Sequence, residues 1–372
     1  MQCIRAGFLS LMLVTLAVAQ SQFVYTNNQS SPNTVTGFVV NSDGSLTQVS
    51  GSPFATGDNG QNGTPFSLAV TTLKEKNYLY AANGADGTIS GFSINPVTGN
   101  LQLVPGSPFA TNAQASNYSL AISPDNRFLF VASDATALIH VFHIISGTGT
   151  LREVPGGPFA VNSPLSGLKV STNGKFLLAG GAPNGVTVFQ IANSGAISEV
   201  PGSPFPSSGA VGALENNCAG NLVFAASFLF NGFINVYSLG ADGSLTPVPG
   251  SPFPTAEANF DLLLSPGNQF LFSSGGFSQT DSVFTVSAGG ALSPIPGSPF
   301  FLPDFTSGIA ITPRGDFLYT VLFISGSVDG EKIGADGTLT PVPGTPFFTN
   351  QNSIAGLVES AVTFPAPSCS RR

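Results

Sequence analysis

Short apolar runs separated by turn residues recur along almost the whole chain, and they predict strands rather than helices. A run such as Phe128 to Ala132 is bounded by Pro, Gly, Asn and Asp, which is typical of a buried strand. After residue 20, no stretch has the spacing of about 3.6 residues that marks an amphipathic helix. The pattern therefore predicts an all-β protein.

One structural unit is repeated seven times along the sequence. A Gly-x-Pro-Phe element recurs with its glycine at positions 51, 106, 156, 202, 250, 297 and 344, and a second glycine stands seven positions before each. A buried-strand pattern such as Tyr78-Leu79-Tyr80 also occurs seven times. Repeats of this length are typical of β-propeller blades, each of which holds four antiparallel strands.

The third repeat predicts how one blade is built. Pro124 to Arg127 has the composition of a turn between two strands. In three repeats a proline falls in the fourth, outermost strand, where a missing N–H costs little. The Phe of each Gly-x-Pro-Phe is expected to pack between neighbouring blades. The predicted strands of the third repeat are Ser119–Ser123, Phe128–Ala132, Leu138–Ile144 and Leu151–Val154, and the three prolines are Pro247, Pro294 and Pro341.

The two ends of the repeat array predict how the ring closes. The array begins at a second strand, from Phe23, and ends with one unpaired apolar segment, Ile354 to Val358. We therefore expect one domain over residues 20–364. It is a seven-bladed β-propeller of four-stranded antiparallel blades, whose C-terminal strand completes the first blade. Such closure removes an exposed sheet edge. Residues 365–372 are expected to form a tail.

The first residues have the pattern of an export signal. Arg5 precedes an apolar run from Gly7 to Ala19, and Ala17-Val18-Ala19 fits the small-x-small cleavage rule. Residues 1–19 are therefore predicted to be a signal peptide, with Gln20 as the mature start. The run is shorter than the about 20 residues that span a bilayer, and an uncleaved anchor or a mistaken start site is the alternative. We expect a secreted or periplasmic protein with no membrane span in its mature chain.

The composition limits the partners of the protein. Charged residues make up 8% of the chain and the net charge is −8, which excludes a charge-driven disordered chain and gives no basic face for nucleic acid. Cys218 and Cys369 remain after signal cleavage, and the sequence leaves open whether they form a disulfide. Neither belongs to a CxxC motif, so no zinc site is expected. The protein is expected to be a monomer.

With these motifs in hand, the chain resembles the lactonase family of seven-bladed propellers. That family includes the propeller-type 6-phosphogluconolactonases and the carboxymuconate cycloisomerases, and the repeated Gly-Ser-Pro-Phe is similar to a secreted bacterial branch. The resemblance implies activity on a small lactone or related acid without a metal or an organic cofactor. It covers nearly all of the predicted propeller. The motifs that carry it are the Asp-Gly-x-Leu turns starting at Asp43, Asp242 and Asp336, and the runs Ser123–Val131 and Thr312–Tyr319.

The resemblance also implies a polar cluster at the central mouth, where this sequence departs from the family. A His-x-His or similar group would begin an innermost strand, with Arg and Glu nearby. Here the comparable start carries Asn117 and Ser119, which can hydrogen-bond a sugar lactone, although neither is a general base near neutral pH. His140 and His143 lie three apart on a predicted third strand and point to opposite faces, so they are expected to be structural or solvent-facing rather than metal ligands.

Charged residues on the innermost strands supply the candidate catalytic groups. Aligned by their turns, these strands place Lys169 and Glu215 in one column of neighbouring blades, with Asp261 two positions before that column. In a catalytic reading, Glu215 or Asp261 deprotonates water and Lys169 stabilises the oxyanion or holds a substrate carboxylate, while Asn259 binds substrate. In an architectural reading, Lys169 and Glu215 form an ion pair between blades. Glu359 is a further candidate for the same mouth.

Two functions remain open at this point. One is an exported lactonase, similar to 6-phosphogluconolactonase, that hydrolyses a sugar lactone at the central mouth. The other is a non-catalytic scaffold that binds a ligand, a glycan or a protein partner. An enzyme should open Lys169 and one of Glu215 or Asp261 into one shared pocket. A scaffold should bury them in pairs between blades or fill the mouth with apolar side chains.

Overall fold

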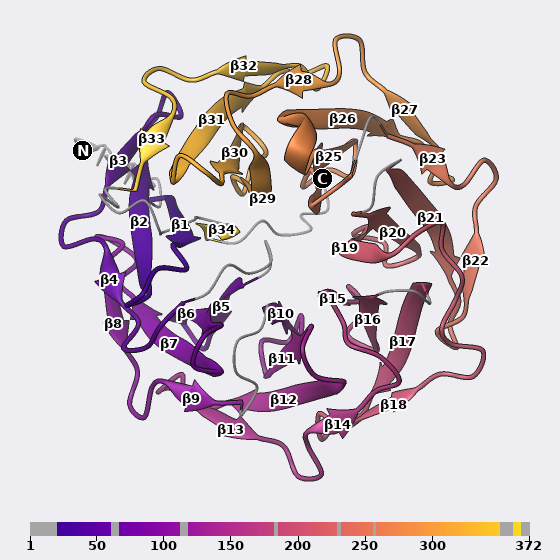
Figure 1. Cartoon of the computed structure of the whole chain (residues 1–372), viewed down its shortest axis with the longest axis horizontal. Helices are drawn as coiled ribbons and strands as arrows, with labels where there is room; N and C mark the ends of the chain where they lie inside the picture. Colours follow the sequence, from indigo (N-terminus) through magenta and orange to yellow (C-terminus); the bar gives the residue numbers. More distant parts are fainter. Residues whose placement is uncertain are drawn as a thin grey trace, which may run out of the picture.

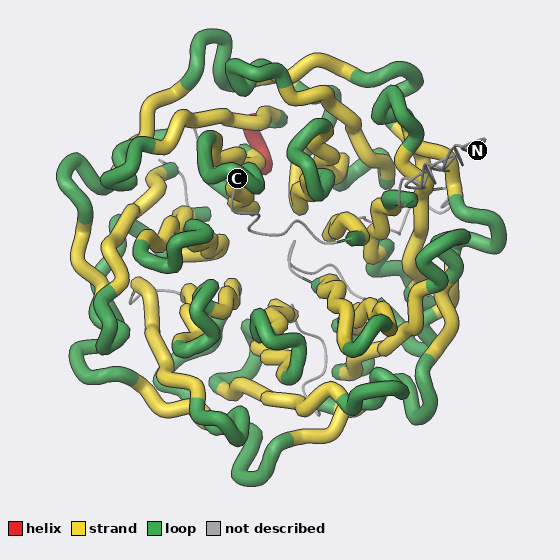
Figure 2. Tube along the Cα trace, turned by 180° about the vertical axis from the view of Figure 1, so that it is seen from behind, coloured by secondary structure: helices red, strands yellow, loops and turns green. Residues whose placement is uncertain are grey.

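The computed structural model describes residues 21–60, 67–111, 118–181, 185–228, 232–255, 258–349 and 360–365. In these residues the chain forms seven antiparallel sheets, arranged as blades around a central axis (Figure 1). Figure 2 shows the same ring from behind, with the outermost strands along its rim. The predicted seven-bladed β-propeller is confirmed.

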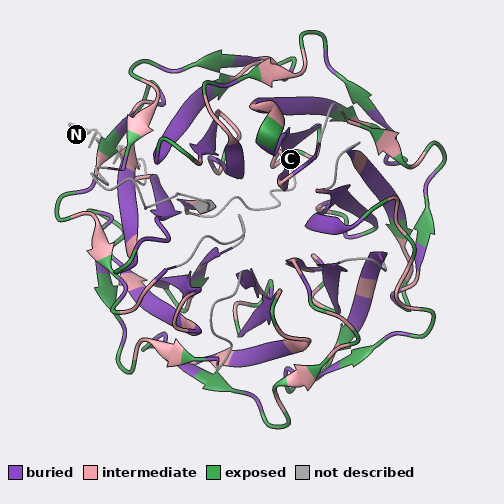
Figure 3. Ribbon diagram, viewed as in Figure 1, coloured by how far each residue is buried: buried purple, intermediate pink, exposed green. Residues whose placement is uncertain are grey.

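Each blade is a sheet whose strands follow one another from the axis to the rim. The inner strands are buried, and the outer strand faces solvent, as Figure 3 shows. We number the blades from the N-terminus. Blade 1 contains β34 (Ser360–Phe364), β1 (Phe23–Asn27), β2 (Thr34–Val40), β3 (Leu46–Gln48) and β4 (Phe54–Ala55). Blade 2 contains β5 (Leu68–Leu73), β6 (Lys76–Asn83), β7 (Thr88–Ile94), β8 (Leu101–Leu103) and β9 (Phe109–Ala110).

The next three blades repeat this order. Blade 3 contains β10 (Tyr118–Ile122), β11 (Phe128–Ser133), β12 (Leu138–Ile144), β13 (Leu151–Glu153) and β14 (Phe159–Ala160). Blade 4 contains β15 (Gly167–Val170), β16 (Phe176–Gly181), β17 (Gly185–Ile191) and β18 (Ile197–Glu199). Blade 5 contains β19 (Val211–Asn216), β20 (Leu222–Ser227), β21 (Phe233–Leu239), β22 (Leu245–Pro247) and β23 (Phe253–Pro254).

The last two blades complete the ring. Blade 6 contains β24 (Asp261–Leu264), β25 (Phe270–Ser274), the short 3₁₀ helix η1 (Gly276–Ser278), β26 (Thr280–Val286), β27 (Leu292–Pro294) and β28 (Phe300–Phe301). Blade 7 contains β29 (Thr306–Ile311), β30 (Phe317–Leu322), β31 (Ser327–Ile333), β32 (Leu339–Pro341) and β33 (Phe347–Phe348). The prolines predicted for fourth strands therefore end β22, β27 and β32.

The ring closes within blade 1, where strands from the two ends of the chain pair. Strand β34 lies antiparallel beside β1, with Phe364 opposite Phe23. The predicted closure by a C-terminal strand is confirmed, but that strand is Ser360–Phe364 rather than the expected Ile354–Val358. The expected segment lies outside the described residues.

The Gly-x-Pro-Phe element adds a feature that the four-strand prediction missed. In six blades its Phe begins a two-residue strand that pairs with the start of the third strand, as β14 does with β12. In blade 4 the corresponding Phe205 makes a single bridge to Val186. The residue before Pro supports the same junction, because its side-chain hydroxyl accepts a backbone N–H of the third strand. Its six hydroxyl acceptors are Ser52, Ser107, Ser203, Ser251, Ser298 and Thr345.

The hydrophobic core consists of seven clusters, one at each seam between neighbouring blades. The cluster of the seam between blades 2 and 3, for example, joins Tyr80 and Ile89 to Leu120 and Leu129. Each cluster is packed by the Phe of one Gly-x-Pro-Phe element, so the predicted position of these rings between blades is confirmed. The seven rings are Phe54, Phe109, Phe159, Phe205, Phe253, Phe300 and Phe347.

Several predictions concern residues at the chain ends. The predicted signal peptide and all but Pro365 of the predicted tail lie outside the described residues, as do Cys3 and Cys369. Cys218 is disulfide-bonded. Within the described part of the chain, no helix is long and apolar enough to cross a membrane.

Candidate functional site

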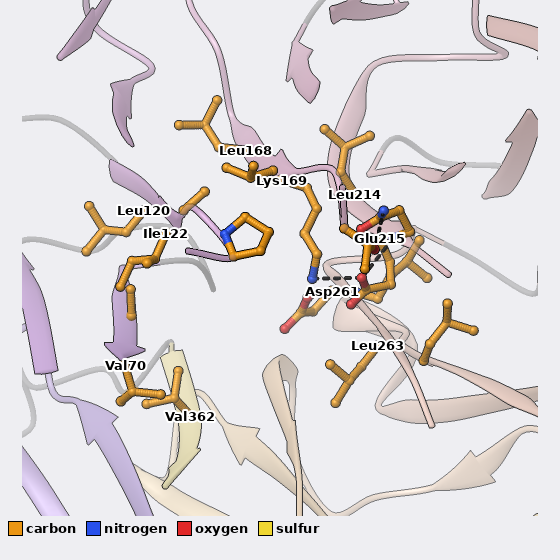
Figure 4. Close-up of a pocket in the computed structure, with 18 of the residues that line it drawn as sticks. Val70, Leu120, Ile122, Leu168, Lys169, Leu214, Glu215, Asp261, Leu263 and Val362 are labelled. Carbon is orange, nitrogen blue, oxygen red and sulfur yellow. Dashed lines mark hydrogen bonds and ion pairs between the residues drawn. The ribbon is translucent and has the colours of Figure 1, made fainter. Parts of the chain in front are cut away.

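A cavity of about 440 Å³ lies on the axis of the ring, between the innermost strands. Most of its wall is apolar, because the first strands contribute mainly Leu, Val, Ile and Ala residues to it. Three charged side chains, Lys169, Glu215 and Asp261, converge on it from blades 4, 5 and 6 (Figure 4). The apolar lining includes Val70, Leu120, Ile122, Leu168, Leu214, Leu263 and Val362.

Lys169 and Glu215 form an ion pair between blades 4 and 5. Lys169 Nζ lies 2.7 Å from Glu215 Oε1, and the side chains are 35% and 8% exposed. The same Oε1 accepts the backbone N–H of Asn216 at 2.8 Å. The two residues lie in one column, as their alignment predicted. Because the Lys169 side chain is partly exposed, the ion pair borders the cavity.

Asp261 stands at the start of β24 and links blade 6 to blade 7. Its Oδ1 accepts the N–H of Leu262 at 2.7 Å, and its Oδ2 accepts the N–H of Ile309 at 2.9 Å. Burial and, to a smaller extent, the Glu215 carboxylate raise the pKa of Asp261 to about 8, although these two N–H donors and the nearby Lys169 lower it. Near neutral pH, Asp261 is therefore mostly a neutral acid that borders the cavity.

The register of the first strands gives Asp261 an equivalent in blade 3. Ser119 precedes Leu120 as Asp261 precedes Leu262, and Ser119 Oγ accepts the N–H of Leu168 in blade 4 at 2.9 Å. The two side chains thus make the same bond across a seam. Asp261 fulfils an architectural role that a serine fulfils elsewhere, and it adds an ionisable group.

The predicted substrate-binding residues have other partners in the structure. Ser119 is 1% exposed and is used by the Leu168 bond. Asn259 is 2% exposed, and its Oδ1 accepts the Ser273 hydroxyl at 2.7 Å. Neither belongs to the described lining of the cavity. Asn117 and Glu359 lie outside the described residues. The binding roles of these residues stay predictions.

The histidines lie on β12, in the third strand of blade 3. His140 Nδ1 is 2.8 Å from Glu153 Oε1, whereas the His143 ring packs edge-on against Phe128. Burial lowers the pKa of His143, and the nearby Arg127 and Arg152 lower it further. The described residues contain no group of three or more His, Cys, Asp or Glu side chains arranged to hold a metal ion.

Sequence analysis missed a second group of buried acids, Asp281, Asp329 and Glu331. They lie on the third strands of blades 6 and 7, outside the axial cavity. A comparison of the third strands with one another contains the signal, because two of these acids replace residues that are apolar in the other repeats.

The closed ring, with a cavity on its axis, is a seven-bladed β-propeller. Residues 16–166 match the model of the family described as "Lactonase, 7-bladed beta-propeller". The predicted resemblance to that family is confirmed by this match and by the fold. No curated protein matches the sequence.

Solved structures with similar folds include two named for lactonases. A Bacteroides fragilis protein assigned as a 6-phosphogluconolactonase is 17% identical, with a TM-score of 0.74 over 93% of this chain and 99% of its own. A periplasmic gluconolactonase from Pseudomonas aeruginosa is 17% identical, with a TM-score of 0.72 over 94% of this chain and 99% of its own. At this identity the similarity shows the fold alone.

Proposed function

We propose that the protein hydrolyses a sugar lactone in the axial cavity. The observation that carries the proposal is the meeting of Lys169, Glu215 and Asp261 in one cavity with otherwise largely apolar walls. Apolar surroundings strengthen the interaction of these groups with a charge that develops during reaction. The family match of residues 16–166 supports a lactone as the substrate class.

Each charged side chain has a role in this reaction. Glu215 removes a proton from water while the water oxygen bonds to the lactone carbonyl carbon. The ammonium group of Lys169 stabilises the oxyanion that forms on the carbonyl oxygen. The oxyanion then re-forms the carbonyl, the ring C–O bond breaks, and Asp261 gives its proton to the departing ring oxygen. The product is the open-chain hydroxy acid.

A panel of sugar lactones, phosphorylated and unphosphorylated, tests the proposal. We expect the purified protein to hydrolyse at least one of them faster than the uncatalysed background. The variant Glu215→Gln should lower kcat by about 10²-fold or more, because general-base catalysis contributes that much. Glu199→Gln, which changes an exposed acid on the outer strand β18, is the matched control and should keep full activity. Background rates on every lactone would refute the proposal.

A second variant separates chemistry from architecture at Asp261. Asp261→Ser keeps a hydroxyl acceptor for the Ile309 N–H, as Ser119 does in blade 3, but removes the acid. We expect its melting temperature to stay close to that of the parent while kcat falls. Unchanged kcat at an unchanged melting temperature would remove Asp261 from the mechanism.

The alternative function is a non-catalytic scaffold. The Lys169–Glu215 pair joins two blades, and the cavity wall is mainly apolar, which are the features expected of that alternative. If the lactone panel gives only background rates, the scaffold becomes the better account, and the cavity becomes a site for a small ligand.

We also infer export to the periplasm or the medium. The support is the signal-like pattern of residues 1–19. Sequencing the N-terminus of the protein recovered outside the cytoplasm should give Gln20 as the first residue, and an intact Met1 would contradict cleavage.

A further inference from the structure

The seam between blades 6 and 7 carries acids at two positions that are apolar or aromatic at every other seam. Asp281 is the second residue of its third strand, and Glu331 is the fifth residue of its own. The residues equivalent to Asp281 are Val35, Ile89, Ile139, Val186, Ile234 and Val328. The residues equivalent to Glu331 are Phe38, Phe92, Phe142, Phe189, Tyr237 and Phe284.

The strand pairing brings these acids together across the seam. Asp281 of blade 6 accepts a hydrogen bond from the Thr320 hydroxyl of blade 7. Thr320 stands directly opposite Asp329 in the β30–β31 ladder. Glu331 is two residues beyond Asp329, and it therefore lies on the same face of β31. Thr345 Oγ1 donates to Asp329 Oδ1 at 2.8 Å.

These carboxyl groups are buried with too few partners for charged groups. Asp281 is 0% exposed and Glu331 is 4% exposed, and neither Asp281 Oδ1 nor Glu331 Oε2 has a hydrogen-bond partner in the described structure. Burial, together with the neighbouring carboxylates, raises the pKa of Asp281 to about 7 and that of Glu331 to about 9. Burial also raises the pKa of Asp329.

No cation faces the cluster from the described strands around it. Strands β25, β27, β28, β30, β32 and β33 contain no charged residue. Lys332 of β31 is exposed, and Tyr319 of β30 bonds through its hydroxyl to Gly44 O of blade 1, at the next seam. Among the described residues, the negative charge of a carboxylate in this cluster can therefore be removed only by protonation or stabilised only by water entering the seam.

We propose that the seam between blades 6 and 7 is a proton-gated joint. It packs while Asp281 and Glu331 are protonated, and it loosens when both carboxyls are ionised. Like charges side by side in a buried seam repel each other, and each needs water that the closed seam excludes. The other six seams have apolar contacts at these positions and lack this response.

The direction of the pH effect follows from the raised pKa values. In the unfolded chain, Asp and Glu titrate near pH 4. The folded pKa values of Asp281 and Glu331 lie near 7 and 9. Between about pH 4 and these folded values, the folded protein therefore binds more protons than the unfolded chain does. The contribution of the cluster to stability is fully present below about pH 4 and is lost as the pH rises through the folded values.

The joint is connected to the axial cavity through the same seam. Asp261 of blade 6 accepts the Ile309 N–H of blade 7, and the Ser274 hydroxyl donates to Ser307 O at 2.5 Å. Loosening at Asp281 and Glu331 therefore acts on the two blades that hold Asp261. This inference does not depend on the proposed lactonase activity.

Thermal unfolding at pH 5 and pH 9 tests the joint. The key variant is Asp281→Val combined with Glu331→Phe, which restores the residues of the other seams. We expect the parent melting temperature to fall between pH 5 and pH 9 by at least about 5 °C more than that of the double variant. Asp261 and the other acids are common to both proteins, so their contribution cancels in this comparison.

Two further variants serve as controls for this experiment. Asp281→Asn combined with Glu331→Gln keeps the side-chain volumes and should also reduce the pH dependence if the apolar pair fails to fold. Glu199→Gln, an exposed acid, should leave the parent profile unchanged. Equal pH dependence in the parent and both double variants would overturn the proposal. A melting temperature at pH 9 that Ca²⁺ raises only in the parent would overturn it too, because the cluster would then be a cation site.

Discussion

Replacing Gly149 with alanine is expected to destabilise the propeller by about 3–5 kcal/mol. Gly149 has a φ of +73°, and a Cβ at this position would lie 2.4 Å from the ring of Tyr78 in the preceding blade. Tyr78 is 1% exposed, so its ring has little room to retreat. The substitution thus combines left-handed backbone strain with a clash inside a seam.

Gly147 is the matched control, because it lies in the same turn. Its φ is +91°, and an added Cβ would meet no atom within 4 Å. Gly147→Ala should therefore lose only the backbone part, about 1 kcal/mol. Chemical denaturation of both variants measures the difference. Equal losses would contradict the packing of the turn against the neighbouring blade.

The variant Phe364→Ala should cost about 3–5 kcal/mol, because it removes a buried ring from the strand that closes the propeller. Phe364 is 2% exposed, and its ring is stacked on Phe23 with centroids 6.4 Å apart. These residues stand opposite each other in the β1–β34 ladder. A loss at this position weakens blade 1, in which the C-terminal strand β34 pairs with β1.

Phe301→Ala provides the comparison for Phe364→Ala. Phe301 lies on β28 and is 83% exposed, so its loss should change the free energy of unfolding by less than about 0.5 kcal/mol. Denaturant midpoints of the two variants give the contrast. If Phe364→Ala is as stable as Phe301→Ala, β34 does not close the ring.

The fold could be predicted because the same turn glycines, Gly-x-Pro-Phe element and apolar strand pattern occur seven times along the chain. The offset between the two glycines fixes the turn before each fourth strand, and the strand boundaries of the third repeat agree within one residue at each end. The prediction of Ile354–Val358 as the closing strand is wrong, because its apolar pattern fits a strand as well as that of Ser360–Phe364 does. Pairing with β1 decides between them, and that pairing is not local.

The candidate site could be predicted only in part. Column alignment of the first strands brings Lys169 and Glu215 together, because register alone determines that contact. The bond from Ile309 to Asp261 and the raised pKa of Asp261 depend on how blade 7 packs against blade 6. Local patterns carry no information about that packing. The buried acids Asp281 and Glu331 were visible only as exceptions within the repeat.

The pH dependence of kcat/KM tests most directly whether the axial cavity is a catalytic site. Asp261 must carry its proton to release the ring oxygen, so lactone hydrolysis, corrected for background, should decline above about pH 8. The variant Asp261→Ser should be slower and should lack this decline. A parent protein without measurable hydrolysis, or a variant with the same alkaline decline, would contradict the account.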